Sequence, residues 1–147
     1  MISNSELQDL DLFDLLSERH GIVRTKIEDM WNNTHDIYIS SSEWYIMAKI
    51  FKHNRNMAYI TKSVNISRQA VHKFVKQLNK KGLVDIQDVE GNKKEKSIQL
   101  TELGEACFLE SKKHKQMIEQ QLIETIGSDN VDKMREILKM DWDIENQ

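Results

Sequence analysis

The stretch Ser67-Arg-Gln-Ala-Val-His-Lys-Phe-Val-Lys-Gln-Leu-Asn-Lys-Lys-Gly-Leu-Val84 decides the fold of this chain. Ser67 is a good N-cap and Gly82 suits the left-handed turn that ends many helices, so a helix is predicted over residues 68–81. On a helical projection its apolar face consists of Ala70, Val71, Phe74, Val75 and Leu78. The opposite face carries Arg68, Gln69, His72, Lys73, Lys76, Asn79 and Lys80. The stretch therefore predicts a half-buried helix whose outer face holds only cations and hydrogen-bonding side chains.

The same helix lies in a segment that has no carboxylates. No Asp or Glu occurs between Glu43 and Asp85, whereas nine Lys or Arg side chains do: Lys49, Lys52, Arg55, Lys62, Arg68, Lys73, Lys76, Lys80 and Lys81. The net charge of the whole chain is only -3, so the basic segment belongs to an otherwise acidic molecule. This placement of charge favours a polyanionic partner over general adhesion to surfaces.

The segments on either side of the basic helix complete a recognisable order. Ser40 and Glu43 have the spacing of a capping box, and the apolar spacing behind them predicts a helix over residues 44–51. A short apolar segment at residues 57–64 predicts another helix, joined to the basic one by a tight turn. Strand-like residues 83–86 and 97–100 flank a charged turn at residues 90–94, which predicts a hairpin. Helix, turn, capped basic helix and charged hairpin is the order of a winged helix-turn-helix.

Helices are also predicted at both ends of the chain. Apolar spacing over residues 7–31 predicts a first helix of about 25 residues, interrupted at Gly21. Thr101 caps a long helix that Gly127 ends, and apolar residues from Val131 to Trp142 predict a final helix. The expected fold class is mainly α with a small β-hairpin. The end helices carry more apolar residues than a chain this short can bury alone, so we expect a homodimer built from both ends.

Several classes of protein are disfavoured by the composition. Cys107 is the only cysteine, so an intrachain disulfide is impossible and a reducing compartment is expected. Residues 1–14 are acidic and unlike a signal peptide, and no apolar run is long enough to cross a bilayer. The five histidines lack metal-ligand spacing, and no catalytic motif is present. We therefore expect a cytoplasmic protein that is not an enzyme and has no cofactor, metal site or membrane partner.

The quoted stretch, together with Ile98-Gln-Leu-Thr-Glu-Leu-Gly104, resembles the MarR family of bacterial transcriptional regulators. The resemblance covers nearly the whole chain. It implies helical dimerisation regions at residues 1–36 and 105–147 around a winged helix-turn-helix DNA-binding domain at residues 37–104. It also implies a homodimer that binds a pseudo-palindromic operator in double-stranded DNA, usually as a ligand- or stress-responsive repressor.

The residues expected to contact DNA come from the basic helix and the hairpin. Arg68, Gln69, His72 and Lys73 lie where base edges are reached, and residues further along the helix meet phosphate. The complete set is Ser67, Arg68, Gln69, His72, Lys73, Lys76, Asn92, Lys93 and Lys94. In the resemblance, Asn92 and Lys94 stand where the family usually has Asp and Arg. Lysine lacks the planar fork of arginine, so weaker hairpin contacts are expected.

The resemblance further implies a crevice for a small aromatic effector. The matching residues are Trp31, His35, Tyr38, Trp44 and Tyr45. Trp31 and Trp44 also lie on apolar helical stripes, so ordinary core packing is an alternative. Cys107 is similarly open to two interpretations, a buried apolar residue or a reactive thiol. For the chain as a whole, the alternative to DNA binding is a winged-helix module that binds protein.

Overall fold

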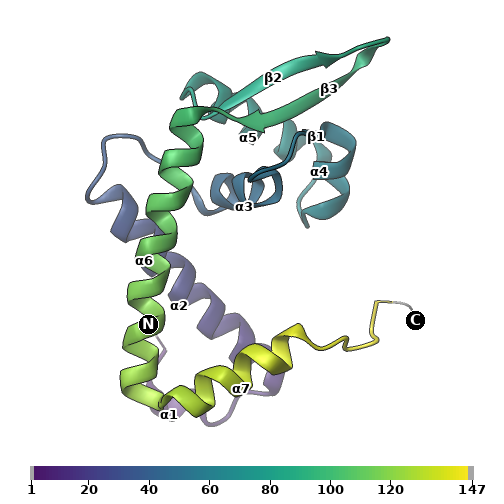
Figure 1. Ribbon diagram of the computed structural model, residues 1–147. Coiled ribbons are helices and arrows are strands. Elements are labelled where there is room, and N and C mark those ends of the chain that lie inside the picture. The colour runs from purple at the N-terminus through teal and green to yellow at the C-terminus, as the bar shows by residue number, and fades with distance from the viewer. Residues whose placement is uncertain (1, 146–147) are drawn as a thin grey trace. The chain divides into compact units, whose positions relative to one another are not determined.

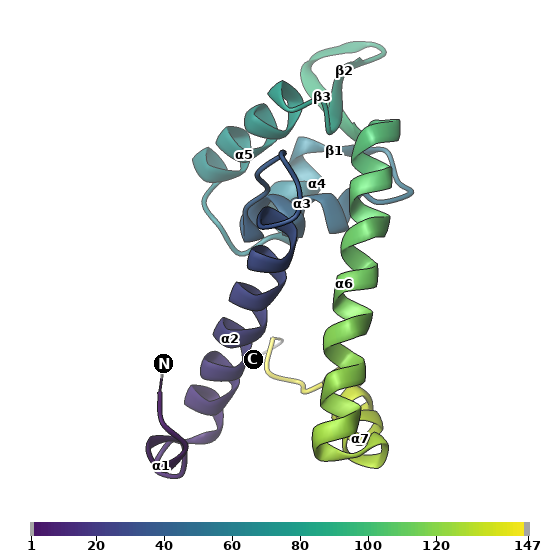
Figure 2. The same ribbon diagram turned by 90° about the vertical axis from the view of Figure 1, so that its left-hand side faces the viewer.

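A computed structural model describes residues 2–145, apart from the side chains of residues 92 and 93. The elements follow the chain in the order α1 (Asn4–Leu7), α2 (Leu12–Asn32), α3 (Ser41–Ile50), β1 (Arg55–Asn56), α4 (Met57–Ser63), α5 (Arg68–Lys80), β2 (Val84–Val89), β3 (Asn92–Leu100), α6 (Glu102–Ile126) and α7 (Ser128–Lys139). Figure 1 labels these elements, and Figure 2 shows them turned by 90°. The expected mainly helical fold with a small β-hairpin is confirmed. None of the described helices is long and apolar enough to span a bilayer.

The chain forms two compact units, one through Ser111 and one from Lys112 onward. Helix α6 contributes residues to both of them. In the second unit Val131 is buried, and Arg135 of α7 forms an ion pair with Glu119 of α6. The division that the sequence predicted, at residues 36/37 and 104/105, stays a prediction.

The core of the first unit lies between α3, α4, α5 and the sheet. Ile46, Met47 and Ile50 of α3 are fully buried, and they meet Val71 and Leu78 of α5 in one cluster. The hairpin of β2 and β3 extends past these helices as an arm (Figure 1). Three short helices and a projecting hairpin form a winged helix-turn-helix, as the order of elements predicted.

The first helix differs from its prediction. Instead of one helix through residues 7–31 there are two, and α2 begins only after Asp11, whose carboxylate accepts a hydrogen bond from Asp14 N at 2.9 Å. Asp11 is therefore an N-cap that starts a new helix inside the apolar pattern. Gly21, by contrast, lies within α2 and does not interrupt it.

The cap predictions for α3 and α5 are confirmed. Ser40 Oγ accepts from Glu43 N, and Glu43 Oε1 accepts from Ser40 N at 3.0 Å, which is the capping box. Ser67 Oγ accepts from Ala70 N at 3.1 Å and starts α5. Gly82 follows α5 with a φ of 76°, a value that favours glycine and that turns the chain directly into β2.

The sheet has one strand more than the hairpin predicted from the sequence. Strand β3 pairs antiparallel with β2, with Ile86 opposite Ile98, and on its other side with β1, where Arg55 lies opposite Ile98. The ladder shifts between Asp88 and Val89, close to the turn. A two-residue strand has no sequence pattern of its own, so β1 could not be predicted.

The last helix is shorter than its apolar pattern. Helix α7 ends at Lys139, although the pattern continued to Trp142. Trp142 instead donates its indole N–H to Ile137 O at 2.9 Å, so it folds back on the end of α7.

Candidate nucleic-acid interface

Helix α5 holds most of the residues predicted to bind DNA, and its two faces differ as predicted. Val71, Val75 and Leu78 are buried in the core. The residues facing away from them are exposed: Arg68, Gln69, His72, Lys73, Lys76, Asn79 and Lys80. The helix has no carboxylate anywhere in its length. Its outer face can therefore donate hydrogen bonds and positive charge to an anionic partner without an acidic residue of the same helix opposing them.

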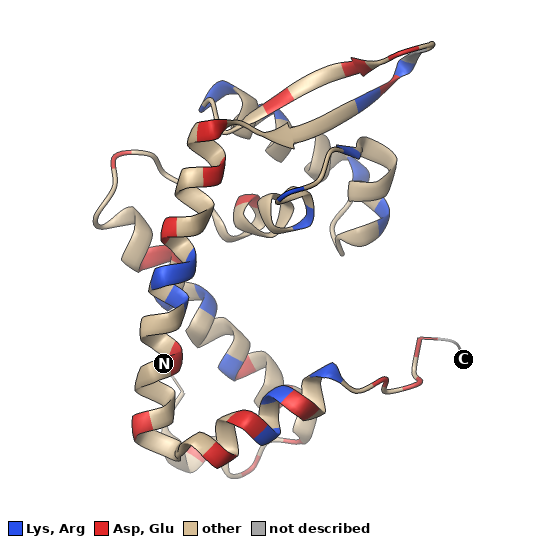
Figure 3. Cartoon of the chain, viewed as in Figure 1, with Lys and Arg blue, Asp and Glu red and all other residues tan. Residues whose placement is uncertain are grey.

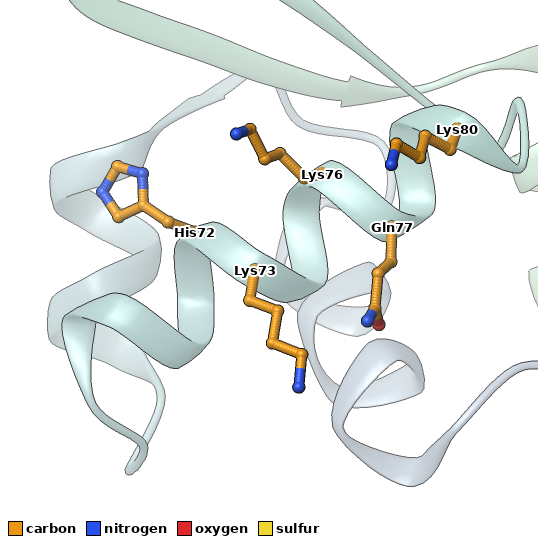
Figure 4. Close-up of a pocket in the computed structure, with 5 residues that line it drawn as sticks. All are labelled: His72, Lys73, Lys76, Gln77 and Lys80. Atoms are coloured by element: carbon orange, nitrogen blue, oxygen red, sulfur yellow. The ribbon is translucent and has the colours of Figure 1, made fainter.

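A hollow follows this outer face. It is lined by His72, Lys73, Lys76, Gln77 and Lys80, all of which project from α5 (Figure 4). Residues four apart in a helix lie on one side of it, so His72, Lys76 and Lys80 form one row and Lys73 and Gln77 another. A strip with this spacing of cations can follow a line of phosphates while Gln77 and His72 supply hydrogen bonds. Three of these lining residues, His72, Lys73 and Lys76, were predicted DNA contacts; Lys80 and Gln77 are additions, and the four-residue spacing from Lys76 pointed to Lys80.

The two lysines at the end of α5 lie in different surroundings. Lys80 lines the hollow, whereas the ammonium group of Lys81 lies 2.7 Å from Glu43 Oε2. Glu43 is only 1% exposed. Lys81 therefore belongs to the interior contacts of the fold and not to the basic face, a distinction that the sequence alone did not make.

The hairpin is less basic than its lysines suggest. Lys96 of β3 forms an ion pair with Asp88, its partner across the ladder with β2. Figure 3 shows acidic segments along β2 and basic segments on β3. Lys94 is exposed. Asn92 and Lys93 were also predicted to contact DNA, and their side chains lie outside the described residues.

The predicted effector residues fall into two groups. Trp31 is 1% exposed, stacks on His35 with ring centroids 3.6 Å apart, and meets Trp44 edge-on at 5.0 Å. The indole N–H of Trp31 donates to Ile37 O at 2.8 Å. These three residues form a packed aromatic cluster, and Trp31 and Trp44 belong to the core, as the core-packing alternative for these two predicted. The Trp44 indole N–H is buried with no hydrogen-bond partner among the described residues.

Tyr38 and Tyr45 lie on the surface instead. Tyr38 donates its hydroxyl to Glu28 Oε1 at 3.1 Å, and this hydrogen bond raises the pKa of the Tyr38 phenol. The Tyr45 ring lies beneath the ammonium group of Lys49, 5.2 Å from the ring centroid. The structure therefore brings Trp31, His35 and Trp44 together and leaves the two tyrosines exposed.

A reactive thiol at Cys107 has little support. Cys107 is 7% exposed, and burial raises the pKa of its thiol, so the thiolate is disfavoured. No cluster of three potential metal ligands occurs among the residues that the structure describes.

One further cation of the basic segment, Arg55, was not among the predicted DNA contacts. The Arg55 guanidinium lies over the Tyr59 ring at 4.2 Å, at the junction of β1 and α4. The four-residue spacing of an arginine and a tyrosine is a signal for such a pair only if both residues are helical. Here Arg55 lies in a strand, so the contact required the structure.

The chain is similar to known proteins in its structure. No family sequence profile and no curated protein sequence matches the chain. Among solved structures, the reduced form of MarR from E. coli is 17% identical, with a TM-score of 0.78 over 88% of this chain and 95% of that one. CouR from Rhodococcus jostii RHA1, solved bound to p-coumaroyl-CoA, is 20% identical, with a TM-score of 0.72 over 90% and 91% of the two chains.

A third neighbour was solved with nucleic acid. Streptococcus pneumoniae FabT in complex with DNA is 16% identical, with a TM-score of 0.72 over 86% of this chain and 90% of that one. These neighbours are all regulators of one family. The chain therefore has the winged-helix fold of the MarR-family transcriptional regulators.

Proposed function

We propose that this protein is a sequence-specific DNA-binding transcriptional regulator. The observation that carries the proposal is the outer face of α5, which is exposed, lined with cations and amides, and without a carboxylate. A helix of this kind enters the major groove with its N-terminal residues at base edges and its later residues at phosphates. FabT, which shares the fold, was solved in complex with DNA, and this supports DNA as the partner.

Substitutions of Arg68 and Lys76 distinguish base-specific contacts from contacts to phosphate. Arg68→Ala should lower affinity for the selected sequence about tenfold to a hundredfold and relax specificity, because arginine can bond guanine with two hydrogen bonds. Lys76→Ala should weaken binding to all sequences alike and make the slope of log K against log salt about 0.9 less steep. Selection of bound duplexes from a random library, followed by titration at several salt concentrations, measures both effects.

The same titration tests the alternative function. A winged helix that binds protein should select no DNA sequence and show no steep loss of affinity with salt. Unchanged affinity and selectivity in Arg68→Ala would contradict the assignment of α5 as the reading helix.

We also propose that the protein acts as a homodimer on a pseudo-palindromic operator, as a repressor. Large apolar side chains are exposed on α2, where Leu12 is 64% and Phe13 68% exposed, and on α7, where Leu138 is 56% exposed. Apolar surface of this extent on end helices supports self-association.

Truncation after Gly127 removes α7 and should give a monomer by light scattering. Removal of residues 141–147 alone is the control and should leave the dimer; a dimer that survives the longer deletion would refute the role of α7.

An effector is proposed on narrower grounds. The Trp31, His35 and Trp44 cluster contains an indole N–H without a described partner, and CouR, which shares the fold, was solved with p-coumaroyl-CoA. An aromatic carboxylate bound near this cluster should raise the melting temperature and change affinity for DNA. Trp44→Phe retains the ring packing and removes the N–H, so a similar shift in this variant would argue against Trp44 as the contact.

A further inference from the structure

Lys81, the C-cap residue of α5, is paired with a buried carboxylate. Its ammonium group donates to both carboxylate oxygens of Glu43, at 2.8 and 2.7 Å. Glu43 is 1% exposed and the Lys81 side chain 26% exposed. A carboxylate this deeply buried is unfavourable without a paired cation, so the two residues depend on each other.

Glu43 has a second task at the same time. Its Oε1 accepts from Ser40 N and from Ser40 Oγ, both at 3.0 Å, within the capping box of α3. The same carboxylate therefore closes the first turn of α3 and binds Lys81, the C-cap residue of α5. This fixes the start of one helix against the end of the other.

The contact continues to α2 through Tyr38. The Lys81 ammonium lies 5.5 Å from the centroid of the Tyr38 ring, within the range of a cation–π interaction. Tyr38 donates to Glu28 Oε1 at 3.1 Å, and Glu28 Oε2 accepts from Ser41 Oγ at 2.6 Å. Side chains from α2, the loop before α3, α3 and the end of α5 thus form one continuous chain of polar contacts.

Other contacts near the end of α5 involve the chain that follows the helix. Asn79 Nδ2 donates to Val84 O at 3.0 Å, and Thr101 Oγ1 donates to Gly82 O at 2.6 Å. These two bonds attach α5 to the sheet and to α6. The Lys81–Glu43 pair adds a polar contact between the end of α5 and α3.

We propose that Glu43 and Lys81 are positioning residues, which fix the orientation of α5 so that its side chains can read DNA bases. Tyr38 and Glu28 connect this pair to α2. The inference rests on the proposed function. Base reading requires side chains placed to within a fraction of an ångström, and locked supporting residues supply that precision. Lys81 thus affects specificity without contacting DNA, whereas its neighbour Lys80 contacts phosphate.

Adjacent lysines provide a matched pair of variants. Lys81→Met removes the ammonium, keeps most of the side-chain stem, and should lower the melting temperature by roughly 5 to 10 °C. At a temperature where it is fully folded, its ratio of specific to non-specific affinity should fall about tenfold with an unchanged salt slope. Lys80→Met, the control, should leave the melting temperature and the ratio unchanged and make the salt slope about 0.9 less steep.

Three further variants keep the test decisive if Lys81→Met folds poorly. Lys81→Arg can still bond Glu43 and should restore stability and specificity. Glu43→Gln retains an acceptor for the capping box and removes the charge, so in a double-mutant cycle with Lys81→Met the two losses should not add. Tyr38→Phe keeps the ring over Lys81, removes the bond to Glu28, and should lower specificity about threefold by the loss of one hydrogen bond.

The outcomes separate this inference from the proposed function. A smaller salt slope in Lys81→Met with an unchanged melting temperature would make Lys81 a DNA contact and overturn the inference. A lower melting temperature with unchanged specificity would do the same, because the pair would then serve stability alone. Failure of the wild-type protein to select any DNA would instead refute the proposed function, while the double-mutant cycle would still report whether the pair forms.

Discussion

Helix α5 and the hairpin of β2 and β3 were both predicted to contact DNA, yet their charges are arranged in opposite ways. Every charged residue of α5 is a cation, and the row formed by Lys76 and Lys80 lies along one exposed hollow. The hairpin mixes Asp85, Asp88, Glu90 and Glu95 with its three lysines. At least one of those lysines, Lys96, is paired with a carboxylate of the neighbouring strand.

The difference shows where a polyanion would be bound. Like charges on α5 repel one another in the free protein, and a line of phosphates relieves that repulsion. The hairpin has much of its charge balanced internally, so DNA gains less by approaching it. Recognition is therefore expected to depend on the helix, with the hairpin as a minor contact.

The largest expected effect is on stability and comes from a substitution of Gly104, which packs against the chain between α5 and the hairpin. Gly104 of α6 approaches the backbone between α5 and β2 so closely that an added Cβ would lie 1.9 Å from Leu83 O. Gly104→Ala should therefore lower the free energy of unfolding by about 3 kcal/mol and displace helix and hairpin together. Urea denaturation measures the decrease.

Gly21 provides the control for this substitution. A Cβ at Gly21, inside α2, would meet nothing within 4 Å. Gly21→Ala should stabilise the protein by about 0.5 to 1 kcal/mol, because alanine is the better helix former. Equal effects of the two substitutions would show that the close approach to Leu83 is not limiting.

The sequence predicted α5 better than any other element because every local signal agreed there. Ser67 as N-cap, the apolar spacing and Gly82 all indicate the same helix, and its outer face follows from the projection. Gly104 shows the limit of prediction from sequence: it belongs to the segment that carries the family resemblance, but the reason for a glycine there is a close approach to Leu83 across the fold. The Glu43 and Lys81 pair is similar, since the two residues are 38 positions apart.

A second prediction compares the cations of the two regions directly. Replacing Lys73, Lys76 and Lys80 with alanine should lower DNA affinity at least about a hundredfold, and make the salt slope about 0.9 less steep for each phosphate that is no longer neutralised. Replacing Lys93, Lys94 and Lys96 should lower affinity less than about tenfold, because the hairpin charge is partly balanced already. Fluorescence anisotropy over a range of salt concentrations gives both values. Equal decreases in DNA affinity would show that α5 and the hairpin contribute alike to binding.

The hairpin and the N-terminal helices show why other predictions fell short. Alternating residues predicted the hairpin, but they did not reveal that its ladder places Asp88 opposite Lys96. The apolar pattern over residues 7–31 was expected to be interrupted at Gly21, yet the helix divides at the N-cap Asp11 instead. For Trp31 and Trp44 the sequence left both a crevice and a core open, and their burial and the edge-on contact of their rings favour the core.

The smallest effect should be a gain of affinity from Asp88→Asn. The substitution keeps the size of the side chain, removes the carboxylate that holds Lys96, and frees that ammonium for a phosphate. Exposed ion pairs are weak, so the expected increase in DNA affinity is about twofold to fivefold at low salt, with a slightly steeper salt slope. Asp85→Asn is the matched control, because Asp85 lies on the same strand opposite Gln99 instead of a lysine. It removes the same charge without releasing a cation and should leave the salt slope unchanged. If the two variants change DNA affinity and salt slope equally, the carboxylates of the hairpin act only through their total charge. The pairing of Lys96 would then not explain why the hairpin is the weaker contact.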